Sequence, residues 1–574
     1  MAKIILKDAT KTDNKDQDKV TTPEKTLERF RERLAQVDLD ILEKTVRVDN
    51  GRLDIPVFMS MCGSDARVVT GNRKQMGKGG TAAQAEASAV MELAERFSLY
   101  AFSNNPGNFV VDTQLNLRDR AMTPLAIAHS VSDTSNEAEK ALGLFSRYPQ
   151  RWCPGTNLTT GQQVMVPFDW FFSINEFNGA SAGNATEEAL CQGISEVVER
   201  HVCALVSRES IATPLIRRDS ITDPMALELI DKFDKNGIEL FLSDLTLGMG
   251  VPTVGALAYD PATMGSSSEI VWTAGTAPNP QKALCRAITE VAQLGGDFNS
   301  NANYLASGLP KPITLSEVDY VIHSSLETRI QDMPDLSNSN IRREVEGLVS
   351  SLSVFGLEVV AIETTHSGLA VPAFYSIVPG TQFRERAKRN RVGLFLAKLI
   401  CENEPPHEAM SWLLKMDAAL PGRYYLIFNI GVQYMALGDP ETALTCFKKA
   451  MEFDPEPEDT PSILVYMGIA LKEMGRYAEA ISLLKMAEAQ DPDRTDCHNL
   501  KGFCYFSLGK HEEAIASFQR VIELDPGSAI DYANIASNYR DLGETDLAIR
   551  FYRQALSLDP SIDFARANLE RLAS

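Results

Sequence analysis

The chain of 574 residues has no apolar run long enough to cross a membrane, and its short, charged start lacks the pattern of a secretory signal. Its nine cysteines form no Cys-x-x-Cys pair, and its seven histidines form no His-Glu-x-x-His motif. An odd number of cysteines, several within apolar helical runs, indicates reduced core thiols in a cytoplasmic protein. These absences argue against a membrane protein, a disulfide-stabilised secreted protein and a metal site built on paired histidines.

Positive charge is also scarce. The 56 Lys and Arg residues are outnumbered by 77 Asp and Glu residues, which gives a formal net charge of −21. Residues 424–574 hold 14 Lys+Arg and 24 Asp+Glu, a net charge of −10, so the C-terminal quarter is the most acidic part. This balance argues against a nucleic-acid partner or an anionic membrane surface.

Two segments repeat one acidic pattern, and a third carries part of it. They read Ser88-x-x-x-Glu92-x-x-Glu95-Arg96, Glu188-x-x-x-Gln192-x-x-x-Glu196-x-x-Glu199-Arg200 and Arg286-x-x-x-Glu290. At about 100° per residue, Ser88, Glu92 and Glu95 fall in a helical stripe about 60° wide. The other positions between 85 and 99 are mostly small or apolar, which is typical of a buried helix whose acids face an enclosed site.

A plain structural interpretation of these segments exists. Glu92 with Arg96, like the matching pairs on the other two helices, is an i,i+4 pair worth about 0.3–0.5 kcal/mol on an exposed helix. That interpretation leaves Glu95 and Glu199 without a role, because adjacent helical residues do not face each other. Carboxylates stacked on an enclosed face repel one another unless a cation lies among them, so the pattern favours a Mg²⁺–nucleotide site.

The three acidic segments have recognisable helix starts. Thr81-x-x-Gln84 and Asn184-x-x-Glu187 predict capping boxes, and Asn279 before Pro280 predicts the start of the third helix. We also expect a helix from about residue 26 and strands at 55–61, 67–70 and 163–172.

Residues 237–252 resemble residues 356–372. Both segments begin with Gly, followed by Ile or Leu and then by Glu, and both end in Val-Pro. A duplicated β-hairpin is the simplest account of this echo, and it predicts a pseudo-symmetric mixed core.

From Tyr424 the sequence becomes a repeat. A pattern of Gly, Tyr, Gly, Ala, Phe, Ala and Pro occurs four times, and Asp-Pro pairs end the copies with spacings of 37, 34 and 34 residues. This is the signature of tetratricopeptide repeats, followed by a polar capping helix at 562–572. Such a solenoid either holds an extended peptide on its concave face or makes a dimer, and the sequence leaves both open.

Three other features carry weaker signals. Residues 74–81 resemble a phosphate loop without the Walker spacing, so we expect only a local anion contact near Lys78. His201 is expected in the core rather than as a base. The basic stretch from Arg384 to Arg391 is expected to be a solvated helix face at a domain junction.

Together, the acidic segments resemble the ATP-binding signature of the YcaO family, with Gln293 completing the third as Arg-x-x-x-Glu-x-x-Gln. The resemblance covers about residues 1–380, and it implies that glutamates from separate helices hold Mg²⁺ ions that bridge the triphosphate of ATP. The implied metal ligands are Glu92, Glu95, Glu196 and Glu199, with Glu290 as a further candidate. The residues implied to contact the nucleotide are Ser88, Asn184, Glu188, Gln192, Arg200, Arg286 and Glu290, with Lys7 and Thr26 at the terminal phosphate.

The resemblance also implies a reaction. In such enzymes a nucleophile attacks a backbone amide, ATP phosphorylates the amide oxygen, and that oxygen leaves as phosphate. Azoline-forming members end in a proline-rich tail, whereas this chain ends Arg571-Leu572-Ala573-Ser574. The resemblance to bacterial members therefore suggests a role accessory to β-methylthiolation of a small-subunit ribosomal protein.

We therefore predict an α+β protein: a pseudo-symmetric mixed α/β YcaO-type catalytic domain at 1–385, a helical junction at 386–423 and four tetratricopeptide repeats at 424–574. The predicted activity is ATP- and Mg²⁺-dependent activation of a backbone amide in a protein or peptide substrate. A thioamide- or azoline-forming peptide maturase is one alternative, and a nucleotide-regulated scaffold without catalysis is another. We expect a homodimer with a peptide or protein partner on the repeats, no membrane and no nucleic acid.

Overall fold

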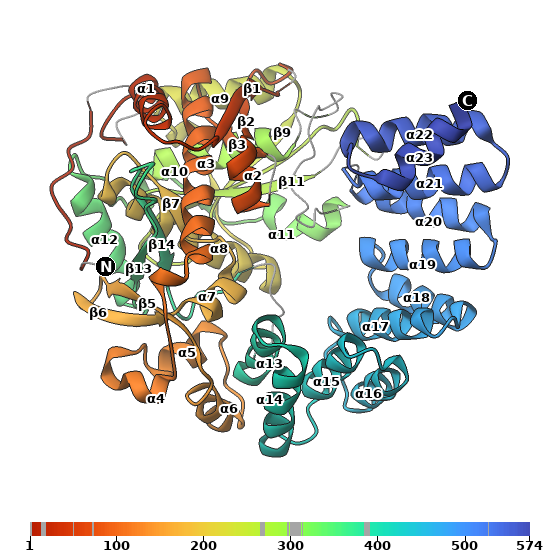
Figure 1. The fold of residues 1–574 in the computed structure, drawn as a ribbon. Helices are drawn as coiled ribbons and strands as arrows, with labels where there is room; N and C mark the ends of the chain where they lie inside the picture. Colours follow the sequence, from red (N-terminus) through yellow and green to blue (C-terminus); the bar gives the residue numbers. More distant parts are fainter. Residues whose placement is uncertain are drawn as a thin grey trace. The chain divides into compact units, whose positions relative to one another are not determined.

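The computed structural model describes residues 3–12, 19–49, 51–71, 74–264, 270–295, 298, 312, 314–383, 391–525 and 527–573 (Figure 1). The chain divides into two compact units, one of residues 1–138 and 142–392 and the other of residues 139–141 and 393–574. Most of the predicted basic stretch, residues 384–390, lies outside the described residues. Of the helices that the structure describes, none has the length and apolar character needed to span a lipid bilayer.

The described residues of the first unit form three sheets. The antiparallel three-stranded sheet has the order β1 (Leu42–Arg47), β2 (Val57–Cys62), β3 (Lys74–Lys78). The five-stranded sheet has the order β11 (Val271–Thr276), β10 (Thr253–Tyr259), β9 (Glu239–Asp244), β8 (Leu215–Ile216), β12 (Glu327–Thr328). The six-stranded sheet has the order β4 (Val110–Asp112), β5 (Gln150–Asn157), β13 (Val360–Glu363), β14 (Ala373–Ile377), β7 (Ala180–Ala182), with β6 (Gln162–Pro167) paired to β5.

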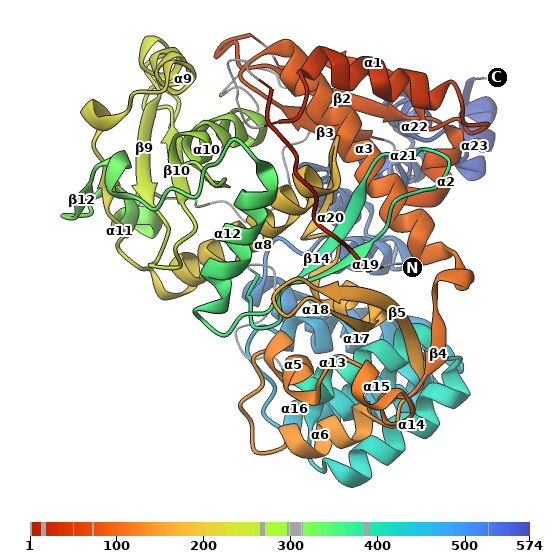
Figure 2. The same cartoon turned by 90° about the vertical axis from the view of Figure 1, so that its left-hand side faces the viewer.

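Helices surround these sheets (Figures 1 and 2). They are α1 (Pro23–Leu34), α2 (Ser64–Thr70), α3 (Ala82–Asn104), α4 (Gln114–Leu117), α5 (Pro124–Ser130), α7 (Phe168–Asn175), α8 (Thr186–Glu209), α9 (Pro224–Lys235), α10 (Pro280–Leu294), α11 (Asp319–Ile322) and α12 (Ile341–Ser353). Helix α6 (Ala138–Phe145) contains residues of both units. The three predicted acidic segments are α3, α8 and α10. Helix α3 packs on β2 and β3, α8 on β7 and β14, and α10 on β10 and β11.

Each acidic helix approaches the strand before it through a pair of small residues. A Cβ atom added to Gly77 on β3 would come under 3.0 Å from the backbone nitrogen of Ala89 on α3, and one added to Gly275 would meet Ala287 on α10 in the same way. On α8 the glycine, Gly193, is on the helix itself, and a Cβ atom added to it would come under 3.0 Å from the hydroxyl oxygen of Ser181 on β7. In each of these three strand–helix pairs, the strand residue and the helix residue that meet are 12 positions apart in the sequence. The three helices therefore dock on their strands in equivalent registers.

The predicted duplicated hairpin is confirmed. β9 pairs antiparallel with β10 in the five-stranded sheet, and β13 pairs antiparallel with β14 in the six-stranded sheet. Each hairpin follows a helix, α9 or α12, that ends before a glycine with positive φ, Gly237 at 67° or Gly356 at 71°. The pseudo-symmetric mixed α/β core follows from this duplication.

Three local predictions are wrong. Residues 67–70 belong to α2, because Asp40 accepts hydrogen bonds from the backbone and the hydroxyl of Ser64 at the helix start. The predicted strand 163–172 turns into α7 at Phe168. The capping box at Asn184 is displaced by one residue, since Glu188 rather than Glu187 accepts from the Asn184 backbone N–H, at 3.1 Å.

The other predicted helix starts are confirmed. Thr81 and Gln84 form a reciprocal capping box at α3, and the Asn279 side chain accepts from the backbone of Gln281 and Lys282 at α10. The helix expected from about residue 26 begins at Pro23, with Thr22 as its N-cap.

The described residues of the second unit form helices and the turns between them. After α13 (Val392–Asn403) and α14 (Pro406–Ala419), the four repeats are the pairs α15 (Tyr424–Ala436) with α16 (Pro440–Glu452), α17 (Thr460–Glu473) with α18 (Tyr477–Gln490), α19 (Thr495–Ser507) with α20 (His511–Leu524), and α21 (Ala529–Asp541) with α22 (Thr545–Leu558). The capping helix is α23 (Asp563–Ala573). Gly431 and Gly502 face Phe447 and Phe518 of the paired helix, so the small residues admit the aromatic rings.

Candidate functional site

The equivalent registers of α3, α8 and α10 place their motif residues at matched positions. The residues just before the helix contact points are Ser88, Gln192 and Arg286, and Glu92, Glu196 and Glu290 follow one turn later. The match between Gln192 and Arg286 was available in the sequence, because Arg286-x-x-x-Glu290-x-x-Gln293 has the spacing of Gln192-x-x-x-Glu196-x-x-Glu199. Three copies of one strand–helix unit therefore supply the candidate site.

The carboxylates of α3 and α8 lie close enough to affect one another. Burial, as the main cause, raises the pKa of Glu95 well above its usual value. Arg96 opposes this rise in the pKa, and the charges of Glu196 and Glu92 increase it. Burial likewise raises the pKa of Glu196, and Glu199 and Glu92 add to it. Acids from two helices thus share one enclosed volume in which burial disfavours their charged forms.

Arg96 is the main cation on α3. Its guanidinium lies 3.0 Å from Glu95 and 3.6 Å from Glu92, and it stacks 3.9 Å from the centre of the Phe177 ring. The Glu92–Arg96 ion pair that a purely structural interpretation requires is therefore present. Arg96 also contacts Glu95, and it lowers the pKa of Glu196 on the neighbouring helix. The pair is part of the acidic cluster rather than an isolated surface contact.

Lys78 links β3 to α10. Its ammonium group makes an ion pair with Glu290, and only 26% of its side chain is exposed. Burial lowers the pKa of Lys78 to about 8, while Glu199 and Glu92 raise it and Arg286 and Arg200 lower it. Lys78 therefore lies among residues from all three acidic helices, which makes it a member of the site that the sequence associated only with a local anion contact.

Two contacts fix the orientation of side chains on α8. A carboxylate oxygen of Glu199 accepts a hydrogen bond from the backbone N–H of Thr276 at 2.9 Å, at the end of β11. The guanidinium of Arg286 donates to the side-chain oxygen of Gln192 at 2.6 Å. These bonds join α8 to the β11–α10 unit at the level of the motif residues.

The start of α8 is bound by the N-terminal segment. The Lys7 backbone N–H donates to Glu187 at 2.6 Å, and the Val20 backbone N–H donates to Glu188 at 3.1 Å. The hydroxyl of Thr26 donates to the side-chain oxygen of Asn184 at 3.2 Å, and Asn184 donates to Glu188. Thr26, Asn184 and Glu188 therefore form one network, whereas the Lys7 side chain is exposed.

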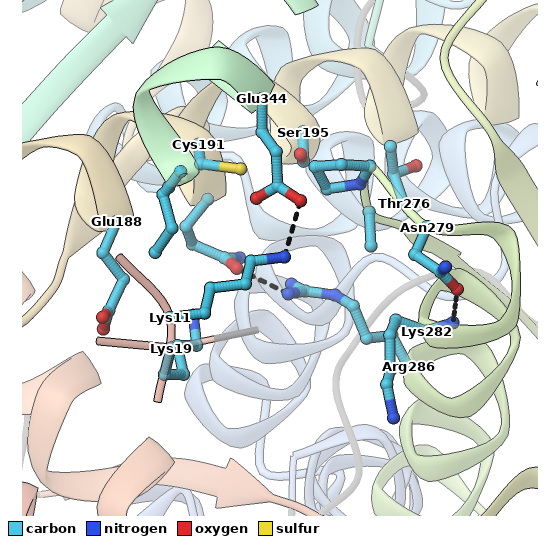
Figure 3. Close-up of a pocket in the computed structure, with 14 residues that line it drawn as sticks. Lys11, Lys19, Glu188, Cys191, Ser195, Thr276, Asn279, Lys282, Arg286 and Glu344 are labelled. Carbon is cyan, nitrogen blue, oxygen red and sulfur yellow. Dashed lines mark hydrogen bonds and ion pairs between the residues drawn. The ribbon is translucent and has the colours of Figure 1, made fainter. Parts of the chain in front are cut away.

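A pocket opens between this segment and the starts of α8 and α10 (Figure 3). The residues that line it are Lys11, Lys19, Glu188, Cys191, Gln192, Ser195, Thr276, Ala277, Pro278, Asn279, Lys282, Arg286, Ile341 and Glu344. Glu188, Gln192 and Arg286 are predicted nucleotide contacts. In Figure 3 the Lys11 ammonium group reaches the buried Glu344 of α12, at 2.6 Å.

Lys11, Lys19 and Lys282 were not predicted from the sequence. Lys11 and Lys19 flank a polar, unpatterned loop, and nothing in their spacing links them to the acidic helices. The N-terminal segment brings Lys11 to the pocket by pairing Thr10 with Asn340 and by donating from the Lys11 backbone to Ser339, whereas Lys282 is on α10. The pocket thus has a cationic lining beside the acidic cluster, a combination suited to a polyanion held with divalent cations.

The donor chemistry of the cluster fits Mg²⁺. Carboxylate oxygens are hard ligands, and a divalent cation among the buried Glu95 and Glu196 would favour the charged forms that burial disfavours. Within the described part of the chain, no group of three acidic, histidine or cysteine side chains is already arranged to hold a metal ion. Metal binding at Glu92, Glu95, Glu196 and Glu199 therefore requires side-chain rotations, which take Glu92 and Glu95 away from Arg96.

We expect Mg²⁺ affinity to rise with pH in the presence of a non-hydrolysable ATP analogue. The raised pKa values of Glu95 and Glu196 mean that these groups must lose protons before they can ligate a metal, so binding releases protons. Titration calorimetry in two buffers of different ionisation enthalpy measures the release. Binding heats that are the same in both buffers would contradict this arrangement.

His201, next to Arg200, is in the core as expected. Its imidazole accepts a hydrogen bond from the Gln382 backbone N–H at 3.0 Å, and burial lowers its pKa to about 4. A neutral, buried imidazole with this partner has a structural role.

Comparisons with known proteins agree with this architecture. The family model described as YcaO cyclodehydratase, ATP- and Mg²⁺-binding, matches residues 76–382, and tetratricopeptide repeat models match residues 424–493, 471–539 and 532–562. An uncharacterised protein of Methanothermobacter thermautotrophicus is 28% identical over 389 residues, which cover 63% of this chain and 94% of that protein. The ribosomal protein S12 methylthiotransferase accessory factor YcaO of Escherichia coli is 30% identical over 184 residues, which cover only 32% of this chain and 30% of that protein.

Solved structures share the fold of the first unit. YcaO from Methanopyrus kandleri, bound with AMPPCP and Mg²⁺, has a TM-score of 0.51 at 24% identity and covers 66% of this chain and 95% of its own. A heterocyclase in complex with substrate and cofactor has a TM-score of 0.55 at 23% identity, over 67% of this chain and 55% of the heterocyclase. The expected cofactors, ATP and Mg²⁺, are confirmed as those of the family. The family model covers more than half of the chain, and this protein therefore belongs to the YcaO family of ATP- and Mg²⁺-binding proteins.

Proposed function

We propose that the protein is an ATP- and Mg²⁺-dependent enzyme that activates a backbone amide in a peptide or protein substrate. The observation that carries this proposal is the meeting of acids from α3 and α8 with the cations Lys78, Arg200 and Arg286. Burial makes such an arrangement costly without a function that uses it. Membership of the YcaO family supports an ATP-dependent activity.

We propose Glu92, Glu95, Glu196 and Glu199 as the metal ligands. When bound, Mg²⁺ and ATP supply a phosphoryl group and neutralise its charge as it transfers to the amide oxygen, which otherwise is a poor leaving group. Ser88, Gln192 and Arg286 lie at matched helix positions beside these ligands, and they are proposed to contact the nucleotide. Glu188 and Asn184 orient Thr26 toward the same end of α8.

Two cationic residues extend the proposed site. Lys78 is proposed to move from Glu290 to a phosphate oxygen when the nucleotide binds, because it already lies among the acids that would bind metal. Lys11 lines the pocket next to Arg286, so it is a better placed phosphate contact than the exposed Lys7. Glu290 is then free to act as a further ligand.

A finer proposal concerns the substrate. The E. coli relative is named as an accessory factor for methylthiolation of ribosomal protein S12, which supports a similar accessory role here on a small-subunit ribosomal protein. We also propose the domain limits 1–385, 386–423 and 424–574. The protein is proposed to form a homodimer and to bind a peptide partner on the repeats.

The test combines ATP turnover with a search for modified proteins. The purified full-length chain is expected to hydrolyse ATP slowly with Mg²⁺ and, in a lysate of cells lacking it, to alter the mass of one protein in an ATP-dependent way. Loss of water indicates azoline formation, exchange of oxygen for sulfur indicates a thioamide, and gain of a methylthio group indicates the accessory role. Binding of ATP without turnover in any of these mixtures would instead favour the scaffold alternative.

A further inference from the structure

A groove lies within the second unit, between the first helices of the second, third and fourth repeats. Its volume is about 440 Å³. Its walls come from α17, α19 and the end of α20 with the start of α21, which follow one another along the solenoid (Figure 1). The lining residues are Val465, Tyr466, Ile469, Thr495, Asp496, Asn499, Leu500, Val521, Asp525, Ser528 and Asp531. This volume is large enough to hold more than one side chain of a bound polypeptide.

The charged lining of the groove has one sign. Asp496, Asp525 and Asp531 line it, and no Lys or Arg is among the lining residues, although residues 424–574 contain 14 of them. Asp496 is bound by Arg494, which is outside the lining. The field inside the groove is therefore set mainly by Asp525 and Asp531.

Asp531 is a carboxylate at a buried position of the groove wall. It is only 2% exposed, and its hydrogen-bond donors in the described part of the unit are neutral: Asn499 and Ser528 at 2.6 Å, and Asn534 at 3.4 Å. These neutral donors leave the Asp531 carboxylate without an ion pair among the described residues, at the wall of the adjacent cavity. A cationic ligand in the groove would complete its pairing.

The cation that fits is organic rather than a metal ion. Beside the aspartates, Val465, Ile469 and Leu500 give the groove an apolar surface, and the other lining residues include the polar Thr495, Asn499 and Ser528. A lysine or arginine side chain carries a cationic head on an aliphatic stem, which matches this combination of surfaces.

We propose that this groove binds an extended polypeptide segment through a lysine or arginine side chain that pairs with Asp525 and Asp531. Apolar neighbours of that side chain in the segment pack on Val465, Ile469 and Leu500, and Asn499 is within reach of its backbone. The groove thereby selects basic segments, and this selection is independent of the nucleotide site proposed above.

The test measures binding of labelled peptides to the full-length chain by fluorescence anisotropy. The probe is an extended, end-blocked peptide with two arginines among apolar residues, and its neutral counterpart carries citrulline at both positions. The arginine peptide is expected to bind at least ~10-fold more tightly than the citrulline peptide, and added salt should reduce the difference. Equal binding of the two peptides, or no binding of either, would overturn the proposal.

Variants locate the binding to the groove. Asp525→Asn with Asp531→Asn removes the two carboxylates proposed to pair with the bound side chain and is expected to weaken binding of the arginine peptide by at least ~10-fold. The matched control, Glu512→Gln with Glu570→Gln, removes the same charge from exposed positions outside the lining. The proposal fails if the control weakens binding as much as the groove variant does. ATP binding should be unchanged in all of these variants, so a failure here leaves the proposed nucleotide site untouched.

Discussion

Glu199→Gln and Glu95→Gln are each expected to reduce Mg²⁺-dependent ATP hydrolysis by more than ~100-fold. Both changes remove a charged oxygen from the cluster while they keep the size of the side chain. Glu199 also accepts the Thr276 backbone N–H, a bond that a glutamine oxygen can retain, so the fold around β11 should be preserved. Measured hydrolysis in the presence of Mg²⁺ checks this, and unchanged rates in both variants would refute the assignment of the site.

The Glu95→Gln variant should also be more stable than the unaltered chain when metal is absent. The raised pKa of Glu95 means that the folded protein binds more protons than the unfolded chain between the usual carboxyl pKa and the raised value. Stability contributed by this group is therefore lost as the pH rises through that window, and a neutral glutamine avoids the loss. Thermal unfolding at neutral pH should show a higher Tm for the variant without ligand and no further rise with Mg²⁺ and an ATP analogue.

Glu228→Gln provides the control for these experiments. Glu228 is on α9 of the same unit, and its side chain is 70% exposed beside Lys232. A change at such a position is expected to alter stability by no more than about 0.5 kcal/mol. If this control raised the metal-free Tm as much as Glu95→Gln, the effect would reflect net charge rather than repulsion within the cluster.

Gly275→Ala and Gly77→Ala are each expected to lower the free energy of unfolding by about 3 kcal/mol. The added methyl group would meet the backbone of α10 or α3, which cannot rotate away as a side chain can, so strand and helix must separate. Because α3 and α10 carry motif residues one position before the contact points, this separation should also weaken nucleotide binding. Denaturant unfolding and nucleotide titration together measure both effects.

Gly347→Ala is the matched control for the glycine variants. Gly347 is within α12, and a Cβ atom there would have its nearest neighbour at 3.7 Å, an ordinary contact with Leu336. Since glycine is unfavourable inside a helix, this change is expected to raise stability by about 0.5–1 kcal/mol. A similar loss of stability in all three variants would mean that close strand–helix contact is not the cause.

Some parts of the molecule could be read from the sequence because their signals are local. The repeats depend on Gly, Ala and aromatic residues whose partners are one helix away, so a period of about 34 residues is enough to predict them. The capping box at Thr81 and the proline after Asn279 likewise involve residues within one helical turn. By contrast, the β-branched Val68 and Val69 suggested a strand, and the distant Asp40 overrode that propensity by capping α2.

The sequence alone determined that three helices carry one acidic pattern and that a tetratricopeptide solenoid follows, because periodicity along a single helix fixes which residues share a face. Only the tertiary structure decided which faces meet. Lys78 reaches Glu290 across more than two hundred residues, and Lys11 reaches the pocket through backbone pairing with residues near 340. Such contacts depend on how sheets and helices pack, and no spacing along the chain records them.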